Sequence, residues 1–434
     1  MSIQIITDIS TVQTNITNAL SGSTIIIPNG TYLVNTIIKI AGTGLTIKAQ
    51  TVGGVIFTGG NISFNITGNN NILDGIQFIN TSSNMSSCGG GNFNSFDLIT
   101  INGSNNTISN ININNVYALH FINIYSGTQY NTITKCNIQN KPMDNTKCLN
   151  SMIEIQGHST IVGFHNINNC SFQNMINGSG GDYGCEPIRL GDSAYSTFNL
   201  SAIVEYCVFD NTHLADNETI SIKSMYNVIR YNTFSNNPNA YISFRNGNNN
   251  YAYGNFFINS SGIRIKQATN IYIYNNYFSG WYPPIIFVDM TGLYPDLTIY
   301  QNNINILNNT FYKCNPISFG NRDTKNNIML NNILYNTSIV GDTSGFTSFE
   351  NINNPTMMIN SKGYYTITSS NSGIAASVDK NPDIDVDSNI LLDITGLTRL
   401  SPFDIGCNNV SNILNEKPIN YPRTLVMVCP SYLN

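Results

Sequence analysis

Positively charged side chains are scarce in this chain, and they cluster. Six of the 19 Lys and Arg residues lie between positions 189 and 266. They are Arg189, Lys223, Arg230, Arg245, Arg264 and Lys266. If one structural repeat takes about 21 to 25 residues, Lys223, Arg245 and Arg264 lie about one repeat apart. We therefore expect a positive column on one face of the molecule, although unrelated surface charges could produce the same spacing.

Two carboxylates precede Lys223. Asp216 and Glu218 are two residues apart, so on an extended strand both side chains point to the same side. Adjacent carboxylates repel each other unless a cation lies between them, and carboxylate oxygens suit calcium. A cation held here would bind the carboxyl group of a uronate sugar, while the positive column would bind its acidic neighbours. These residue types point to an acidic polysaccharide as the partner.

Composition and charge exclude several other classes of protein. The chain has 434 residues, of which 10% are charged, 41% hydrophobic and 11% aromatic. Such a chain can build a large core, so global disorder is not expected. No run of about 20 apolar residues exists, which argues against a membrane span. The net charge of -5 and the lack of a basic run argue against nucleic-acid binding. We expect a monomer.

The nine cysteines do not form a metal-binding or redox motif. Their number is odd and no CxxC pair occurs. Cys170 and Cys207 each precede a phenylalanine by two residues, and on a strand they would share its face. We expect buried thiols rather than disulfides. The N-terminus lacks the basic and apolar regions of a secretory signal.

A repeated motif predicts the elements that position the charged residues. The motif Asn-x-Phe places aromatic residues at Phe234, Phe257, Phe278 and Phe311, and Cys207-Val-Phe209 and Asn332-Ile-Leu334 are variants of it. Successive spacings are 25, 23, 21, 33 and 23 residues. A βαβ unit needs about 30 or more residues, so three short strands per coil fit better. The sequence predicts an all-β parallel β-helix, with Asn and Gly at corners that require positive φ.

We expect one domain over residues 1–434. Apolar residues at near-helical spacing in residues 9–20 predict a short capping helix, within a cap of about residues 1–25. The coils would span about 26–345 and a C-terminal cap about 346–434, where the Asn-x-Phe motif stops. Residues 175–187 and 280–298 read as loops that leave the coil.

Three central stretches, Glu218–Ser224, Asn227–Phe234 and Phe244–Gly247, are flanked by Glu186–Ser193 and Gly262–Ile265. These stretches resemble the motifs of polysaccharide lyase family six, whose members include chondroitinase B and alginate lyases. Ile26–Tyr32 resembles the family's first-turn motif, and Asp393–Arg399 with Asp404–Gly406 resembles its closing motif. The resemblance covers most of the chain.

The resemblance implies a right-handed, pectin-lyase-like β-helix that cleaves uronate polymers by β-elimination. Lys223 would be the base and Arg245 would assist the leaving oxygen. Calcium, held by Asp216 and Glu218 with Asp182 as candidate third ligand, would neutralise the uronate carboxylate. Residues in the matching motifs would bind substrate: Glu186, Arg189, Arg264 and Asn246.

The chain departs from the family pattern at four places. Asn246 stands where the family has His, and Asp216 where Glu is usual. Asp182 lies near the position of an Asn ligand, and the segment between Lys223 and Arg245 is one residue longer. The Lys and Arg pair itself is retained.

Alternative interpretations remain open at this stage. Arg189 and Arg264 could equally pair with Glu186 or another carboxylate to brace the coil, and His120 is more typical of a wall residue. The chain could be a non-catalytic glycan-binding β-helix, such as a surface or virion fibre, or a hydrolase using two carboxylates. We rank the lyase first, the binding protein second and the hydrolase third. The expected substrate implies an extracellular or virion-associated protein.

Overall fold

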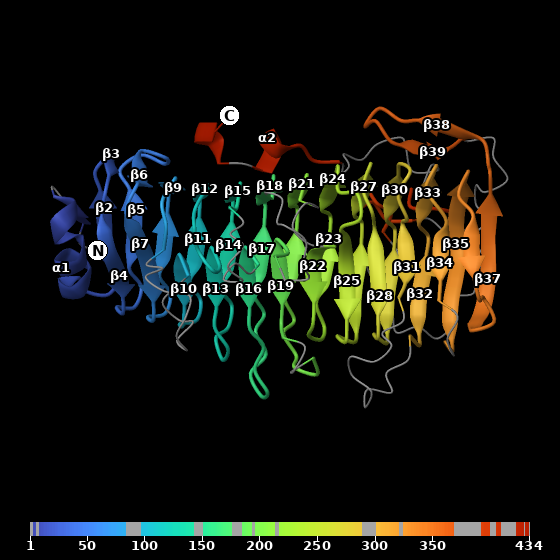
Figure 1. Cartoon of the computed structure of the whole chain (residues 1–434), viewed down its shortest axis with the longest axis horizontal. Coiled ribbons are helices and arrows are strands. Elements are labelled where there is room, and N and C mark those ends of the chain that lie inside the picture. Colours follow the sequence, from blue (N-terminus) through green and yellow to red (C-terminus); the bar gives the residue numbers. More distant parts are fainter. Residues whose placement is uncertain are drawn as a thin grey trace. The chain divides into compact units, whose positions relative to one another are not determined.

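The computed structural model describes residues 3–5, 8–83, 97–142, 151–175, 185–192, 196–212, 217–288, 301–320, 324–368, 392–399, 405–408, 422–428 and 430–433. The chain divides into two compact units. The first comprises Met1–Ser224 and Thr424–Asn434, and the second comprises Met225–Arg423. Within each unit, short strands stack in parallel, coil upon coil (Figure 1). The predicted fold class, a right-handed parallel β-helix, is confirmed.

The first unit repeats three strands per coil along most of its length. Its strands are β1 (Ile3–Ile5), β2 (Thr24–Ile27), β3 (Gly30–Tyr32), β4 (Asn35–Ile40), β5 (Thr46–Ala49), β6 (Val55–Thr58), β7 (Asn61–Ile66), β8 (Ile72–Asp74), β9 (Ile76–Ile79), β10 (Ile99–Ile101), β11 (Thr107–Ser109), β12 (Asn112–Asn114), β13 (Ile122–Ile124), β14 (Thr132–Thr134), β15 (Asn137–Gln139), β16 (Ile153–Ile155), β17 (Asn166–Asn168), β18 (Ser171–Gln173), β19 (Ile188–Leu190), β20 (Ile203–Glu205), β21 (Val208–Asp210) and β22 (Glu218–Ile222). Strands β4, β7, β10, β13, β16, β19 and β22 pair in that order. We call them the site sheet of the first unit.

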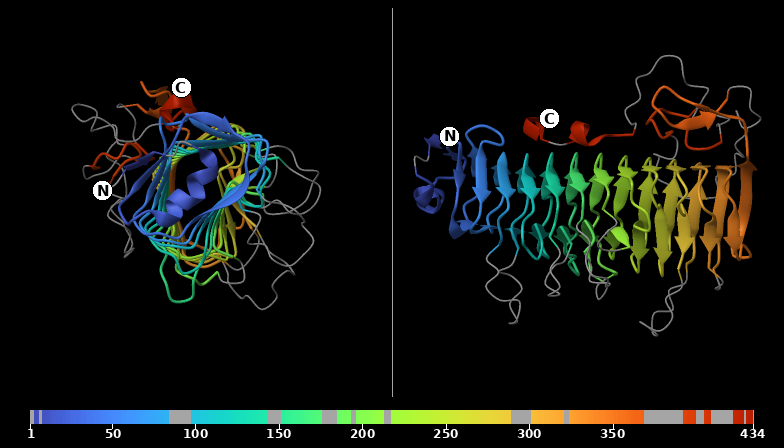
Figure 2. Two further views of the ribbon diagram at one scale, coloured as in Figure 1. Left: turned by 90° about the vertical axis from the view of Figure 1, so that its left-hand side faces the viewer. Right: turned by 45° about the horizontal axis from the view of Figure 1, so that its top comes forward.

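The predicted capping helix is present at the start of the first unit. A short 3-10 turn, Ile9–Thr11, leads into α1 (Val12–Asn18). Val12 and Ile16 are four residues apart and both are buried, which gives the helix one apolar face. Looking along the coil, α1 lies across its open end (Figure 2). The helix therefore covers the apolar interior of the first coil.

The second unit continues the same pattern of short parallel strands. They are β23 (Val228–Arg230), β24 (Thr233–Ser235), β25 (Tyr241–Arg245), β26 (Asn250–Tyr253), β27 (Phe256–Ile258), β28 (Ile263–Lys266), β29 (Ile271–Tyr274), β30 (Tyr277–Ser279), β31 (Ile285–Phe287), β32 (Ile304–Leu307), β33 (Thr310–Tyr312), β34 (Ile317–Phe319), β35 (Asn327–Tyr335), β36 (Ile339–Gly341) and β37 (Phe346–Asn353). β38 (Met357–Ile359) and β39 (Tyr365–Ile367) form an antiparallel pair.

Two details differ from the sequence-based expectation. Parallel pairing continues through β37, because Asn351 prolongs the asparagine ladder after the Asn-x-Phe motif has ended, so the coil passes residue 345. The expected loop at 280–298 contains strand β31, which pairs with β28, while residues 289–298 lie outside the described part. Among the described residues, no helix is long and apolar enough to span a membrane.

The Asn-x-Phe motif forms two buried ladders in the second unit. Phe234, Phe257, Phe278 and Phe311 stack in consecutive coils, with ring centroids 4.8, 4.6 and 5.0 Å apart. The asparagines two residues earlier donate and accept hydrogen bonds from coil to coil along the chain Asn232, Asn255, Asn276, Asn309 and Asn332. The asparagines of the motif are therefore structural.

In the first unit, cysteines occupy the corresponding corner. Cys136, Cys170 and Cys207 are fully buried thiols outside any disulfide, as predicted for Cys170 and Cys207. Burial raises the pKa of the Cys136 and Cys170 thiols well above their usual value. These thiols fill the interior and are not available as nucleophiles or metal ligands.

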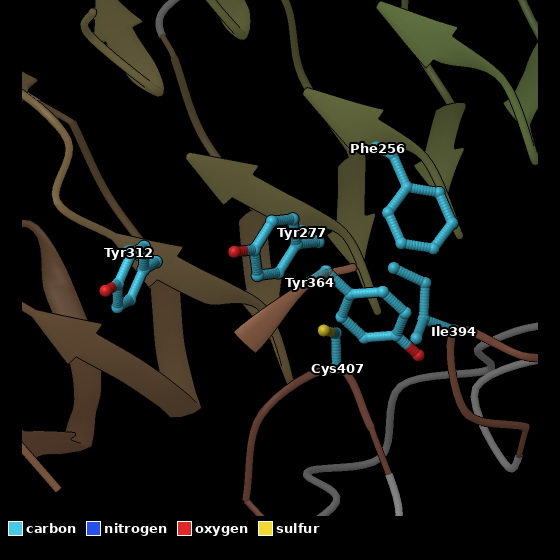
Figure 3. Packing of buried hydrophobic residues seen from close by; sticks show 6 residues of the cluster. All are labelled: Phe256, Tyr277, Tyr312, Tyr364, Ile394 and Cys407. Carbon is cyan, nitrogen blue, oxygen red and sulfur yellow. The ribbon is translucent and has the colours of Figure 1, made fainter. Parts of the chain in front are cut away.

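A separate aromatic cluster joins C-terminal segments to the second unit (Figure 3). Phe256, Tyr277 and Tyr312 come from strands of the coil, and Tyr364 packs against the first two of them. Ile394 and Cys407 come from the segments 392–399 and 405–408, and both are fully buried. These segments therefore pack on the coil of this unit. Asp404, part of the proposed closing motif, lies outside the described residues.

Candidate functional site

The outward column of the first unit's site sheet carries polar residues in register. Isoleucine and leucine at alternate positions point into the core, so the residue between them faces outward. From β7 to β22 this column contains Asn65, Thr100, Asn123, Glu154, Arg189 and Ser221. Glu154 and Arg189 are direct neighbours on adjacent strands. In a chain with only 10% charged residues, this face concentrates charge.

His120 lies between two carboxylates, and we call the three residues Asp97, His120 and Glu154 the bracket. Its Nδ1 lies 2.7 Å from Oδ1 of Asp97, and its Nε2 forms an ion pair with Oε2 of Glu154 at 2.6 Å. Burial alone would lower the pKa of His120, but the two carboxylates outweigh it and raise the pKa overall. The expectation of a buried wall residue is confirmed, since His120 is 4% exposed. Its two carboxylate contacts were not predicted.

Glu154 connects this bracket to the cations of the site. Burial raises the pKa of its carboxyl group, but the contact with His120 and the charges of Arg189 and Lys223 lower it overall. A buried lysine lies close by: Nζ of Lys141 donates to the carbonyls of Leu119 and Ser151, at 2.6 and 3.1 Å. Burial lowers the pKa of Lys141 to about 7.

Arg189 and Glu186 form an ion pair in the first unit. Nε of Arg189 donates to Oε1 of Glu186 at 2.7 Å, and Nη2 approaches Oε2 at 3.4 Å. Glu186 is fully buried. Burial alone would lower the pKa of Arg189, but the charge and hydrogen bond of Glu186, together with the charges of Glu154 and Asp192, raise the pKa overall. Arg189 therefore pairs with Glu186 and braces the coil, as one of the two interpretations predicted. The Arg189 side chain is still 12% exposed.

The backbone of Lys223 is held tightly at the end of β22. Its N–H donates to the carbonyl of Leu190 at 2.8 Å, and the hydroxyl of Ser224 donates to the same carbonyl at 3.0 Å. Gly191 lies opposite with a φ of +86°, and a Cβ there would lie 2.7 Å from the Lys223 carbonyl oxygen. The side chain of Lys223 is only partly buried. A fixed backbone in a partly buried residue suits a side chain that reaches a substrate.

The proposed calcium ligands are only partly described. Glu218 begins β22 and is 3% exposed, whereas Asp182 and Asp216 lie outside the described residues. Within the described ranges, no group of three or more His, Cys, Asp or Glu side chains is placed to hold a metal ion. Two aspartates and a glutamate are oxygen donors of the type that calcium prefers. The donor chemistry therefore fits, and the arrangement stays a prediction.

The second unit places Arg245 beside a different cation from the one expected. Arg245 ends β25, and its register partner on β28 is Lys266. Arg264 instead pairs with Ser243 and donates from Nε to the Ser243 hydroxyl at 2.8 Å. The inclusion of Arg264 in the column was therefore wrong, because the coil spacing here is 21 residues and not 19. Arg264 still shares the outward face of β28, and its guanidinium lies 5.7 Å from the ring centroid of Tyr241.

Asn246 follows Arg245 in a left-handed conformation. Its φ is +62°, its side chain is buried, and its backbone N–H donates to the carbonyl of Lys266 at 3.1 Å. Within the described part of the chain, neither side-chain amide atom of Asn246 makes a hydrogen bond. Buried amides are normally paired. Because Asn246 is only 1% exposed, a ligand would reach its amide only after neighbouring groups move.

Arg230 belongs to the frame of the second unit and not to the site. Its Nη1 donates to the hydroxyl of Tyr253 at 2.9 Å, and its guanidinium lies over Tyr231. These two contacts indicate a structural role for Arg230.

Sequence reasoning missed Asp97, Glu154 and Lys141, and it did not place Lys266. Register partners on the strands around the first three are 31 or 35 residues apart, so their spacing does not follow the 21 to 25 residue repeat. The rarity of carboxylates was an available signal, since the whole chain has only 24 Asp and Glu residues. Lys266 was noted among the clustered cations, but only the strand register shows that it is the neighbour of Arg245.

Comparisons with known proteins agree with the fold. The model of the family described as Chondroitinase B matches residues 6–339. No curated protein sequence matches the chain. Among solved structures, the chain is similar to the PL6 family alginate lyase AlyGC, with a TM-score of 0.70 and 20% identity over 84% of this chain. The chain spans only 55% of that protein.

Two further solved structures match over most of their own length. One is a mannuronic acid specific polysaccharide family 6 lyase from human gut microbiota, with a TM-score of 0.63, 20% identity and coverage of 81% of this chain and 86% of that chain. The other is a complex of the alginate lyase AlyF-OU02 with G6, with a TM-score of 0.64, 17% identity and coverage of 85% and 90%. At these identities the similarity establishes the fold.

Proposed function

Because the chain belongs to the chondroitinase B family, we propose that it is a polysaccharide lyase that cleaves a uronate-containing acidic polysaccharide by β-elimination. The observation that carries the proposal is Lys223, whose backbone is fixed by Leu190, Ser224 and Gly191 while the residue is only partly buried. Lys223 comes directly after β22, whose sheet also carries Glu154 and Arg189 on its outward face.

In this proposal, Lys223 acts as the base. Its neutral amine takes the proton from C5 of the uronate, and the electron pair left behind forms the C4–C5 double bond as the C4–O bond breaks. A C5–H beside a carboxylate is a weak acid, since its removal adds negative charge next to an existing one. Catalysis therefore depends on cations aimed at that developing charge.

Arg245 stabilises the leaving glycosidic oxygen. A guanidinium holds its proton too strongly to be an efficient acid at neutral pH, so we assign it charge stabilisation, with the proton coming from water. Lys266, its neighbour on β28, adds a second positive charge to the same face of the second unit. Once neighbouring groups move, the side-chain amide of Asn246 offers both a donor and an acceptor to sugar hydroxyls.

Asp182, Asp216 and Glu218 are the proposed calcium ligands. When bound, calcium neutralises the uronate carboxylate and so makes the C5 proton more acidic. Arg189 contributes positive charge on the same face of the first unit, and Glu186 fixes its orientation. Calcium dependence is therefore an expected property of the activity.

We propose alginate as the first substrate to test, since the similar solved structures reported above are alginate lyases. The experiment follows the ultraviolet absorbance of the conjugated double bond with alginate, dermatan sulfate, chondroitin sulfate and pectate. It includes samples with calcium and with chelator. A rise on one polymer identifies the substrate class.

The key variant is Lys223→Met, which removes the amine and keeps the length of the side chain. Its matched control is Lys39→Met, because Lys39 is an exposed lysine in the same outward column of the first unit's site sheet. We expect loss of at least about 1,000-fold in rate for Lys223→Met, and no change for Lys39→Met. Full activity of Lys223→Met would overturn the proposal, and no absorbance on any polymer with retained binding would favour the glycan-binding alternative.

A further inference from the structure

We propose that His120 is a positioning residue of the first unit's site: as an imidazolium between Asp97 and Glu154, it holds the Glu154 carboxylate in place and limits the negative charge near Lys223. This inference rests on the proposed function, because it concerns the base of that reaction. His120 itself does not touch the substrate in this proposal.

The two close contacts favour a doubly protonated ring: the Nδ1 contact is a hydrogen bond, and the Nε2 contact is an ion-pair approach without hydrogen-bond alignment. Nδ1 and Nε2 lie 2.7 and 2.6 Å from carboxylate oxygens of Asp97 and Glu154. A neutral imidazole has one N–H, so one of these contacts would set a nitrogen lone pair against an oxyanion. The imidazolium turns both contacts into attractions between opposite charges. Asp97 and Glu154 are 2% and 7% exposed, so solvent screens this interaction little.

Other groups of the first unit fix the bracket from several sides. Nδ2 of Asn123, on β13, donates to Oδ2 of Asp97 at 2.8 Å. The backbone N–H of His120 donates to Oδ1 of the same carboxylate at 3.2 Å. Asp97 also raises the pKa of the Tyr125 hydroxyl, after the larger effect of burial. From the segment that follows β15, Nζ of Lys141 donates to the carbonyl of Leu119, the residue before His120.

Glu154 transmits the charge state of His120 to the cations. It is the register neighbour of Arg189, and its carboxylate interacts electrostatically with both Arg189 and Lys223. Two carboxylates and one imidazolium leave one net negative charge in the bracket. A neutral residue at position 120 leaves two, with Glu154 free to compete with Glu186 for Arg189.

The consequence for Lys223 has a definite sign. Additional negative charge favours the ammonium form of a nearby lysine and raises its pKa. A base must be neutral to accept a proton, so the rate would fall and its rise with pH would move to higher pH. The extra charge would also repel an acidic polymer. His120→Gln should therefore raise KM as well as shift the pH profile.

The test compares pH–rate profiles of the full chain on the polymer that the wild type cleaves. The variants are His120→Gln, Glu154→Gln and the double variant, with Lys39→Met as the control. We expect His120→Gln to lower kcat/KM roughly 10-fold at neutral pH. It should also shift the acidic limb of the pH–rate profile, where the rate rises with pH, to higher pH by about one unit. Glu154→Gln should move the limb down. The double variant should return it close to the wild-type position, because it again leaves one negative charge.

A purely structural role predicts a different pattern. The limb would stay in place in every variant, and the double variant would be the least active and least stable. That pattern, or a double variant that fails to restore the limb, would overturn the proposal. Thermal unfolding of each variant identifies any that does not fold.

A nitrogen NMR titration tests the bracket independently of any activity. The chain has only four histidines, and the signal missing in His120→Gln assigns the residue. We expect both ring nitrogens of His120 to remain protonated well above the usual pKa of about 6.5. A neutral ring at pH 7 would overturn the inference even in an active enzyme. If the wild type cleaves no polymer but the ring is doubly protonated, the proposed function fails and the bracket stands.

Discussion

At the scale of single residues, the main result is how a few backbone contacts present Lys223. Gly191 adopts a φ of +86° directly against the carbonyl of Lys223. A side chain at this position would push on the strand end that carries the amine. The glycine belongs to the Glu186–Ser193 motif, which the sequence singled out without showing why a glycine is needed there.

We predict that Gly191→Ala disturbs Lys223, whereas Gly22→Ala does not. Gly22 has a similar φ of +80°, but a Cβ there would have no atom within 4 Å. Both variants should lose about 1–2 kcal/mol from the left-handed backbone. Gly191→Ala should lose more, since its Cβ would meet the Lys223 carbonyl oxygen at 2.7 Å, and its rate on the cleaved polymer should fall at least about 10-fold. Urea unfolding and initial rates measure both, and equal behaviour of the two variants would contradict the prediction.

Sequence reasoning found part of the candidate site at this scale. Lys223, Arg189 and Glu186 were recognised because cations are rare and the motifs resemble a known family. Glu154 was not recognised, because its register partners on the adjacent strands, Asn123 and Arg189, are 31 and 35 residues away and fall outside the 21 to 25 residue repeat. Only strand register places it beside Arg189.

At the scale of the elements, the buried asparagine ladder is the feature that defines the coils of the second unit. Asn276 is fully buried. Its Nδ2 donates to the carbonyl of Ala252 and to Oδ1 of Asn309, while its Oδ1 accepts from the backbone and side chain of Asn255. The Asn-x-Phe spacing predicted this stacking because side chains with the same period must align in successive coils.

We predict that Asn276→Ala lowers the free energy of unfolding by about 3–5 kcal/mol, since it leaves several buried polar groups without partners. The control is Asn259→Gly. Asn259 donates to Asn236 in an exposed ladder, and its φ of +51° is one that glycine adopts freely. That change should cost less than about 1 kcal/mol. Urea denaturation compares the two, and similar losses would show that burial of the ladder is unimportant.

At the scale of the whole molecule, residues distant in sequence close the second unit. Arg399 is 3% exposed, and its Nη2 donates to Oδ1 of Asn275 and to the carbonyl of Gly406 at 2.8 and 2.7 Å. These bonds fix the segment that carries Cys407 beside Tyr364 (Figure 3). The motif suggested that these residues matter, but the aromatic cluster could not be predicted, because no local spacing relates Tyr364 to Phe256.

We predict that Arg399→Met loosens this segment. Charged hydrogen bonds contribute about 1.5–3 kcal/mol each, so local opening should increase by at least about 10-fold. The readout is labelling of Cys407, which is fully buried, followed by peptide mass mapping. Cys314, another buried thiol of the second unit, serves as the internal control. Unchanged labelling of Cys407 would show that the aromatic cluster alone holds the segment.

The most direct test of the proposed chemistry is the isotopic composition of the products. A polyuronate is cleaved in water enriched in heavy oxygen, and the new chain ends are analysed by mass spectrometry. β-Elimination predicts an unsaturated end with one water fewer than a hydrolysis product and no heavy oxygen gained at the cleaved bond. Lys223→Met should release no such product, while Lys39→Met should release as much as the wild type. Saturated products that carry heavy oxygen would identify a hydrolase and contradict the assignment of Lys223 as the base of a lyase.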